Sequence, residues 1–205
     1  MKYIFVAGAP GSKWSSVVKN IYWSPSIDHS DYSEQRTYHH DATGTHQLMH
    51  LGAYWDPGME FGDHFDHMDL HSREECEAEF DRPFSGEGIR IVKSHSFCYH
   101  IDFLKETWPD CPVVLVHREN DACLGWWVRC GHFDITYPNY AWYRNLRYMA
   151  EEINSQNYAL RHYWHNNKKK LPVTNKHLAL QLGIKPPPDE FHQNYEVNDI
   201  KVALV

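Results

Sequence analysis

The sequence lacks the features that define several broad classes of protein. No apolar run reaches membrane-spanning length, and the run at residues 3–8 is far too short for a signal peptide. Basic residues are outnumbered, 20 Lys and Arg against 27 Asp and Glu, and the net charge of −7 argues against general binding to nucleic acid or to a membrane. The five cysteines are an odd number without a Cys-x-x-Cys pair, so we expect reduced thiols in a cytoplasmic protein. Residues 1–205 are enough for one domain with a substantial core.

The sequence also lacks a recognisable metal-binding motif, although it contains 16 histidines. These are scattered, and neither His-Glu-x-x-His nor a zinc-type Cys/His spacing occurs. His64 and His67 lie among aspartates that would bind a metal only adventitiously. A polar, histidine-rich loop region is the favoured interpretation, and no metal site is predicted. A non-enzymatic, histidine-rich binding protein stays open as an alternative.

The N-terminal stretch predicts a cradle for an anion. Residues 3–8 read Y-I-F-V-A-G, which favours a buried strand, and an amphipathic helix is expected from Lys13 to Trp23. The turn between them, A-P-G-S-K-W-S-S, ends at a helix N-terminus, where free backbone N–H groups and the helix dipole attract negative charge. Further donors would be Lys13 and the hydroxyls of Ser12, Ser15 and Ser16. An ordinary strand-to-helix turn without a ligand explains this stretch alone equally well.

The turn does not match the standard nucleotide phosphate loop. That loop requires G-x-x-x-x-G-K-S/T, but Gly8 is five residues before Lys13 and Ser12 stands where a glycine is needed. Trp14 follows the lysine, so the hydroxyl that would hold magnesium is missing. This argues against a nucleotide-dependent kinase, which we keep as an alternative.

Two further strands are predicted to end in polar residues. Residues 89–95 form an apolar strand that ends in Lys93, Ser94 and His95, and Val113–Val116 lead into His117 and Arg118. In an open parallel α/β sheet, ligands bind beyond the carboxyl ends of the strands. We therefore expect an α/β fold in which the three strand ends form one pocket, with His117 facing away as a structural residue.

The remaining segments are mostly helical or polar. Residues 24–87 are predicted to hold a lid-like excursion, and the polar stretch from Asp189 predicts an extended C-terminus. Helices are predicted at 72–80 with Ser72 as N-cap, 100–107, 119–130, 138–154 and 157–166, and after Thr174.

Four motifs resemble those of the sulfotransferases that use 3′-phosphoadenosine 5′-phosphosulfate, and they follow one another along the chain in the same order as in that family. R-I-V-K-S-H at 90–95 is similar to the family's strand ending in K-T-H, and V-V-L-V-H-R-E-N-D at 113–121 to its strand followed by R-x-P-x-D. A-P-G-S-K-W-S-S is similar to the family's P-K-S-G-T-T-W loop, and L-A-L-Q-L-G-I at 178–184 to its late helix. The position of the family's second 3′-phosphate ligand falls on Trp126 or Gly125, neither of which has a hydroxyl.

The resemblance implies a P-loop-like three-layer fold. It also implies transfer of a sulfuryl group, without a metal, to a small-molecule or sugar-like acceptor, whose binding site would lie in the excursion at residues 24–87. It implies His95 as general base, Lys93 and Lys13 as catalytic cations, and Arg118 as the 3′-phosphate ligand. Trp14 would stack on adenine or pack in the core. The residues implied to bind the donor are Pro10, Gly11, Ser12, Lys13, Trp14, Ser15, Ser16 and Arg118.

Overall fold

The chain alternates between strands and helices over most of its described length. A computed structural model describes residues 1–31, 52–54, 65–129, 145–167 and 173–205. The elements, with η for a 3-10 helix, are β1 (Tyr3–Gly8), α1 (Trp14–Tyr22), β2 (Ala53–Tyr54), η3 (Phe65–Leu70), α2 (Arg73–Asp81), β3 (Arg90–Ser94), η4 (Ser96–Tyr99), α3 (Ile101–Thr107), β4 (Val113–His117), α4 (Asn120–Arg129), α5 (Leu146–Asn166), α6 (Leu178–Gln181), η7 (Asp189–Phe191), η8 (Tyr195–Asn198) and β5 (Lys201–Leu204).

A five-stranded sheet forms the centre of the fold. Its order is β2-β3-β1-β4-β5, with the first four strands parallel and β5 antiparallel to β4. All six residues of β1 are buried, as a central parallel strand covered on both faces requires. Ala7 is in register with Ser94, and Gly8 with Val116. The carboxyl ends of β1, β3 and β4 therefore meet at one edge of the sheet, and the predicted α/β fold with a mainly parallel sheet is confirmed.

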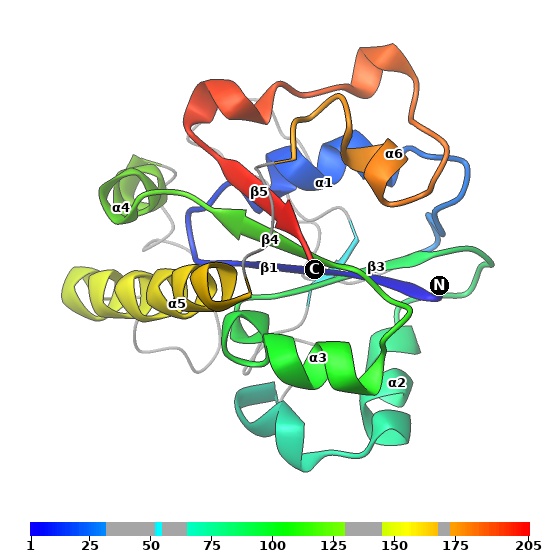
Figure 1. The fold of residues 1–205 in the computed structure, drawn as a ribbon, viewed down its shortest axis with the longest axis horizontal. Coiled ribbons are helices and arrows are strands. Elements are labelled where there is room, and N and C mark those ends of the chain that lie inside the picture. The colour runs from blue at the N-terminus through cyan, green and yellow to red at the C-terminus, as the bar shows by residue number, and fades with distance from the viewer. Residues whose placement is uncertain (32–51, 55–64, 130–144, 168–172) are drawn as a thin grey trace.

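Helices cover both faces of the sheet (Figure 1). Because side chains alternate along a strand, Ile4 and Val6 pack into the core cluster that includes α1 and α6. Tyr3 and Phe5 point the other way, into the cluster formed with α2 and α3. The sheet thus separates two apolar cores, and α1 starts at the edge where β1 ends.

Each described stretch of the segment 24–87 contributes buried residues to the core. Ile27 forms a parallel bridge with Ile89, and β2 is the sheet's outer strand beside β3. Ser72 caps α2 in a reciprocal capping box with Glu75, which confirms the predicted cap and helix. The centre of the predicted lid, residues 32–51 and 55–64, lies outside the described residues.

One helix replaces the two that the sequence predicts at 138–154 and 157–166. α5 is continuous from Leu146. The side chain of Asn145 caps it by accepting hydrogen bonds from the backbone N–H groups of Arg147 and Tyr148. The predicted break was wrong because the side-chain amides there find acceptors: Gln156 donates to Glu152 within α5, and Asn157 donates to the carbonyl of Arg118. Residues 138–144 lie outside the described part. None of the described helices, α5 included, combines the length and apolar character that a membrane crossing requires.

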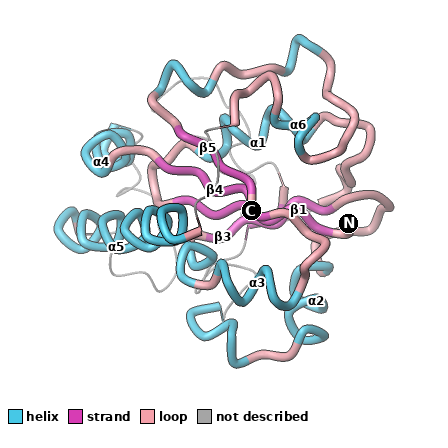
Figure 2. The backbone as a smooth tube through the Cα atoms, in the orientation of Figure 1, coloured by secondary structure: helices cyan, strands magenta, loops and turns pink. Residues whose placement is uncertain are grey.

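The prediction of an extended polar C-terminus from Asp189 was also wrong. Two short 3-10 helices precede β5, which pairs antiparallel with β4 (Figure 2). The strand is short and its pattern weak, but Val202 and Ala203 are buried against β4. The C-terminal segment therefore belongs to the sheet and passes next to the end of β4.

Candidate anion-binding and transfer site

The loop after β1 has the shape of an anion cradle. Gly11 and Lys13 both adopt the left-handed conformation, with φ values of 75° and 59°. Lys13 is the N-cap residue of α1, and the amide of Ser12 closes the turn on the carbonyl of Ala9, 3.0 Å away. The first turn of α1 begins at this point, and the amide of Ser16 donates to the carbonyl of Lys13 at 2.8 Å. Left-handed residues beside a helix start turn backbone N–H groups toward one concave spot.

Gly11 is needed because α4 packs directly on the loop. A Cβ at this position would overlap the carbonyl group of Cys123. The positive φ adds a second reason, since a side chain is strained there. A glycine thus brings the loop after β1 and the start of α4 into contact, and Arg118 lies at the end of β4 just before that helix.

His95 is packed tightly at the end of β3. Its imidazole stacks on the indole of Trp14, with ring centroids 4.1 Å apart and planes 2° from parallel. The Nδ1 atom lies 2.5 Å from the carbonyl oxygen of Gly8. A carbonyl only accepts, so Nδ1 carries the proton in the neutral ring and Nε2 carries the lone pair. Burial lowers the pKa of His95 to about 4, and the ring is therefore neutral at physiological pH.

Lys93 lies beneath this stack. The strand ends at Ser94 and His95 begins the turn into η4, so the alternation that links Lys93 to His95 stops between them. A strand continued through residue 95 would have placed Lys93 and His95 on one face. Instead, both side chains meet at Trp14: the Lys93 Nζ lies 5.8 Å from the centroid of the indole on which His95 stacks. Lys93 is completely buried.

Arg118 reaches across to the loop after β1. Its Nε donates to the carbonyl of Asn198 at 3.0 Å, and its Nη1 donates to the carbonyls of Gly11 and Ala122 at 3.4 Å and 3.0 Å. Within the described part of the chain, its hydrogen bonds all go to neutral oxygens. Its own carbonyl accepts from Asn157 of α5, which is fully buried. The guanidinium is therefore held in place while its charge is not paired with a described carboxylate.

Lys13 and Arg118 meet on the same residue of the C-terminal segment. The Lys13 Nζ donates to the Oδ1 of Asn198 at 2.7 Å and lies 3.8 Å from the centroid of the Trp126 ring. Asn198 thus accepts from both cations, through its side chain and its backbone carbonyl. Sequence reasoning missed Asn198, because the polar segment around it matches no motif.

The other predicted donor residues surround the loop. Ser12 is almost completely buried, and its hydroxyl, which lies over Gly8, has no hydrogen-bond partner among the residues described here. Pro10 precedes the left-handed Gly11, and Ser15 and Ser16 lie half-buried in the first turn of α1. A buried hydroxyl without a partner is costly, and an anion oxygen would satisfy it.

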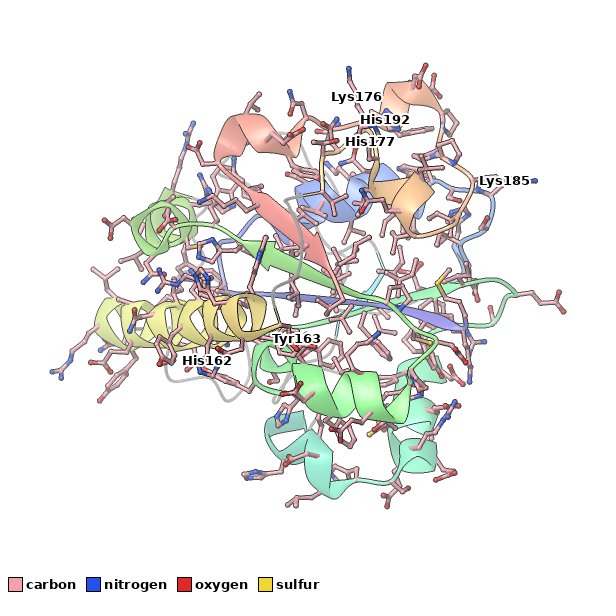
Figure 3. All side chains as sticks on the ribbon, viewed as in Figure 1. His162, Tyr163, Lys176, His177, Lys185 and His192 are labelled. Carbon is pink, nitrogen blue, oxygen red and sulfur yellow. The ribbon has the colours of Figure 1, made fainter. Side chains whose placement is uncertain are left out.

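Other titratable groups lie apart from this cluster. His117 is buried on β4, in register with Lys201, and burial lowers its pKa. No group of three or more His, Cys, Asp and Glu among the described residues is arranged to hold a metal, and His64 lies outside them. Four other basic side chains gather around α6, at the far end of the molecule from α4 (Figure 3): Lys176, His177, Lys185 and His192.

No protein-family model, curated protein or solved structure matches this chain. The chemistry of the site therefore rests on its own geometry: a loop of backbone donors, two cations from different strand ends, and a neutral imidazole stacked beside them. Such an arrangement can bind a ligand with two separated anionic groups and accept a proton next to one of them.

Proposed function

We propose that this protein is a sulfotransferase that uses 3′-phosphoadenosine 5′-phosphosulfate as donor and a hydroxyl or amine as acceptor. The observation that carries the proposal is the convergence of Lys13 and Arg118 on Asn198, with His95 stacked on the residue that follows Lys13. A ligand with phosphate groups on the 3′ and 5′ oxygens of one ribose fits two cations contributed by separate strand ends. The resemblance of the three strand-end motifs supports the same donor.

The residues present fit such a donor on two counts. The buried hydroxyl of Ser12, which has no hydrogen-bond partner among the described residues, is a donor that an anion at the loop would satisfy. Nε and Nη1 of Arg118 donate to neutral carbonyls, and Nη2, which makes no described hydrogen bond, would donate to a phosphate oxygen. The donor would supply an activated sulfuryl group whose leaving group is the 5′-phosphate.

The protein's part in the reaction is positioning, charge stabilisation and proton removal. Nε2 of His95 takes the proton from the acceptor while the acceptor oxygen or nitrogen forms its bond to sulfur and the bond from sulfur to the 5′-phosphate oxygen breaks. The hydrogen bond from Nδ1 to Gly8 fixes the tautomer that leaves Nε2 basic. Lys13 and the loop amides face the charge that grows on the leaving phosphate, and the buried charge of Lys93 supports the same region.

The proposal is tested by thermal denaturation with 3′-phosphoadenosine 5′-phosphate, the desulfated product. A ligand at one hundred times its Kd stabilises a protein by about 2.7 kcal/mol, which is several degrees for a chain of this size. We expect this shift with the product, and none with magnesium ATP or with adenosine 5′-monophosphate at equal concentration.

Variants locate the response. Arg118→Gln should lose most of the shift, whereas Arg147→Gln, which removes only an exposed contact with Glu151 on α5, should keep it. Stabilisation by magnesium ATP without a response to the desulfated product would replace the proposal with the kinase alternative. Equal shifts in the two variants would remove Arg118 from the site.

A further inference from the structure

Asn198 joins two cations that come from distant parts of the chain. Lys13 is at the start of α1, and Arg118 follows β4. The side-chain oxygen of Asn198 accepts a hydrogen bond from Lys13 at 2.7 Å, and its backbone carbonyl accepts one from Arg118 at 3.0 Å. A single residue therefore contacts both positive groups.

The segment that carries Asn198 is firmly anchored. Tyr195 is buried at the other end of η8, and its hydroxyl donates to the carbonyl of Val173 at 2.6 Å. After Asn198, Asp199 takes the left-handed conformation and turns the chain into β5. Lys201 at the start of that strand is in register with His117 at the end of β4. The antiparallel pairing delivers Asn198 to the carboxyl edge of the parallel strands.

The chemistry of an amide at this position differs from that of a carboxylate. An amide oxygen accepts a hydrogen bond and carries no net charge, so it orients an ammonium without neutralising it. An aspartate in the same place would have nearly the same shape, would keep the bond to Lys13, and would add a negative charge between the two cations. Asparagine therefore combines two properties that an anion site needs: cations held in place, and a positive field.

We propose that Asn198 is a positioning residue of the anion site: it orients Lys13 and Arg118 toward one ligand without placing a negative charge between them. This inference rests on the proposed function only in that an anion binds between these cations. It makes the C-terminal segment, for which the sequence offers no motif, a working part of the donor site.

The test compares Asn198→Asp with Asn194→Asp. Asn194 caps the same 3-10 helix by accepting from the amide of Glu196, and it makes no described contact with either cation, so its variant adds the same charge four residues away. Binding of 3′-phosphoadenosine 5′-phosphate is measured by calorimetry at several salt concentrations, and the melting temperature without ligand is measured for each protein. Asn198→Asp should bind about tenfold more weakly or worse, because a charge within bonding distance of Lys13 repels the ligand.

The stability readout separates positioning from a purely structural role. The ligand-free melting temperature of Asn198→Asp should be unchanged or higher, since the carboxylate pairs with Lys13. Asn194→Asp should bind as the original protein does. Asn198→Ala, which removes only the side-chain bond and leaves the carbonyl that Arg118 uses, should fall between them in affinity.

Equal affinity of Asn198→Asp and Asn194→Asp overturns the inference. If the nucleotide does not bind the original protein, the same comparison is made with inorganic pyrophosphate. Binding of pyrophosphate that weakens only in Asn198→Asp supports the role of Asn198 and rejects the nucleotide donor. No binding of either ligand overturns both proposals.

Discussion

His95 illustrates how one side chain can be basic and buried at the same time. Stacking on Trp14 and the hydrogen bond to Gly8 fix its orientation, and burial lowers its pKa to about 4. A lowered pKa weakens the ring as a base, yet it keeps the ring unprotonated over the physiological range. The hydrogen bond from Nδ1 compensates in part, because it favours the imidazolium as a proton arrives.

This environment predicts the pH dependence of the reaction. His95 is almost entirely unprotonated at pH values well above 4. We therefore expect kcat/KM to stay constant as the pH is lowered from neutral and to fall only as it approaches about 4. The same lowered pKa means that the unfolded chain binds the proton more tightly. His95 therefore favours the folded state above its ordinary pKa near 6.5, and that contribution is lost as the pH falls toward 4.

His95→Ala should lower the rate of transfer about 10²–10⁴-fold while the desulfated product still binds. His117→Ala, a change in a buried histidine outside the cluster, is the matched control and should retain transfer. Rates are measured from pH 4 to 8 with product binding checked by calorimetry. Unaltered turnover in the His95 variant, or an acid limb centred near pH 6.5, contradicts the assignment.

The contact between the loop after β1 and α4 depends on one glycine. Gly11→Ala places a methyl group against the carbonyl of Cys123 in a backbone conformation that disfavours a side chain. We expect a loss of about 2–3 kcal/mol in the free energy of unfolding, together with weaker donor binding. Gly125→Ala is the control, because Gly125 lies in the middle of α4 and an added Cβ would meet no atom within 4 Å. This variant should raise the free energy of unfolding by about 0.5–1 kcal/mol. Urea titration measures both, and equal midpoints for the two variants would show that the contact is unimportant.

The elements around the site were predictable because their signals are local. The apolar runs of β1, β3 and β4 and the cap of α2 follow from neighbouring residues, and parallel pairing then brings the strand ends together. The structure places Lys13, Trp14, His95 and Arg118 in one cluster.

The other features of the site could not be predicted from the sequence, because they depend on residues that meet only in the folded chain. Asn157 looks like a helix breaker until its amide is seen to donate to the carbonyl of Arg118 and to Asn120. Asn198 looks like part of a polar tail until Lys201 pairs with His117. Alternation along a strand would put Lys93 and His95 on the same face, but the chain becomes helical at His95. The two side chains come together because both pack on Trp14.

Across the whole molecule, a net charge of −7 contrasts with the small cluster of cations at the sheet edge. A negatively charged protein repels an anionic donor at a distance, and the attraction acts only where Lys13 and Arg118 lie close together. We therefore regard the site as one that recognises its ligand by close contact rather than by a broad positive surface.

The cysteines connect this site to the stability of the entire chain. Cys123 is fully buried beneath the loop on one side of the sheet, and Cys76, Cys98 and Cys111 are buried in the core on the other side. Burial raises the pKa of the Cys76 thiol to about 11 and that of Cys123 to about 12, so few thiolates exist at pH 8. Reaction with a thiol reagent then requires opening of the structure.

If the two cores unfold together, these four buried thiols should react with 5,5′-dithiobis(2-nitrobenzoic acid) at one slow rate that rises with urea. Added 3′-phosphoadenosine 5′-phosphate should slow all four by the same factor, 1 + [L]/Kd, because the ligand stabilises only the folded state. Peptide mapping by mass spectrometry assigns the labels. Rapid labelling of Cys123 alone, independent of urea, would show instead that the loop and α4 open separately, and protection of Cys123 alone by the ligand would place that local opening at the donor site.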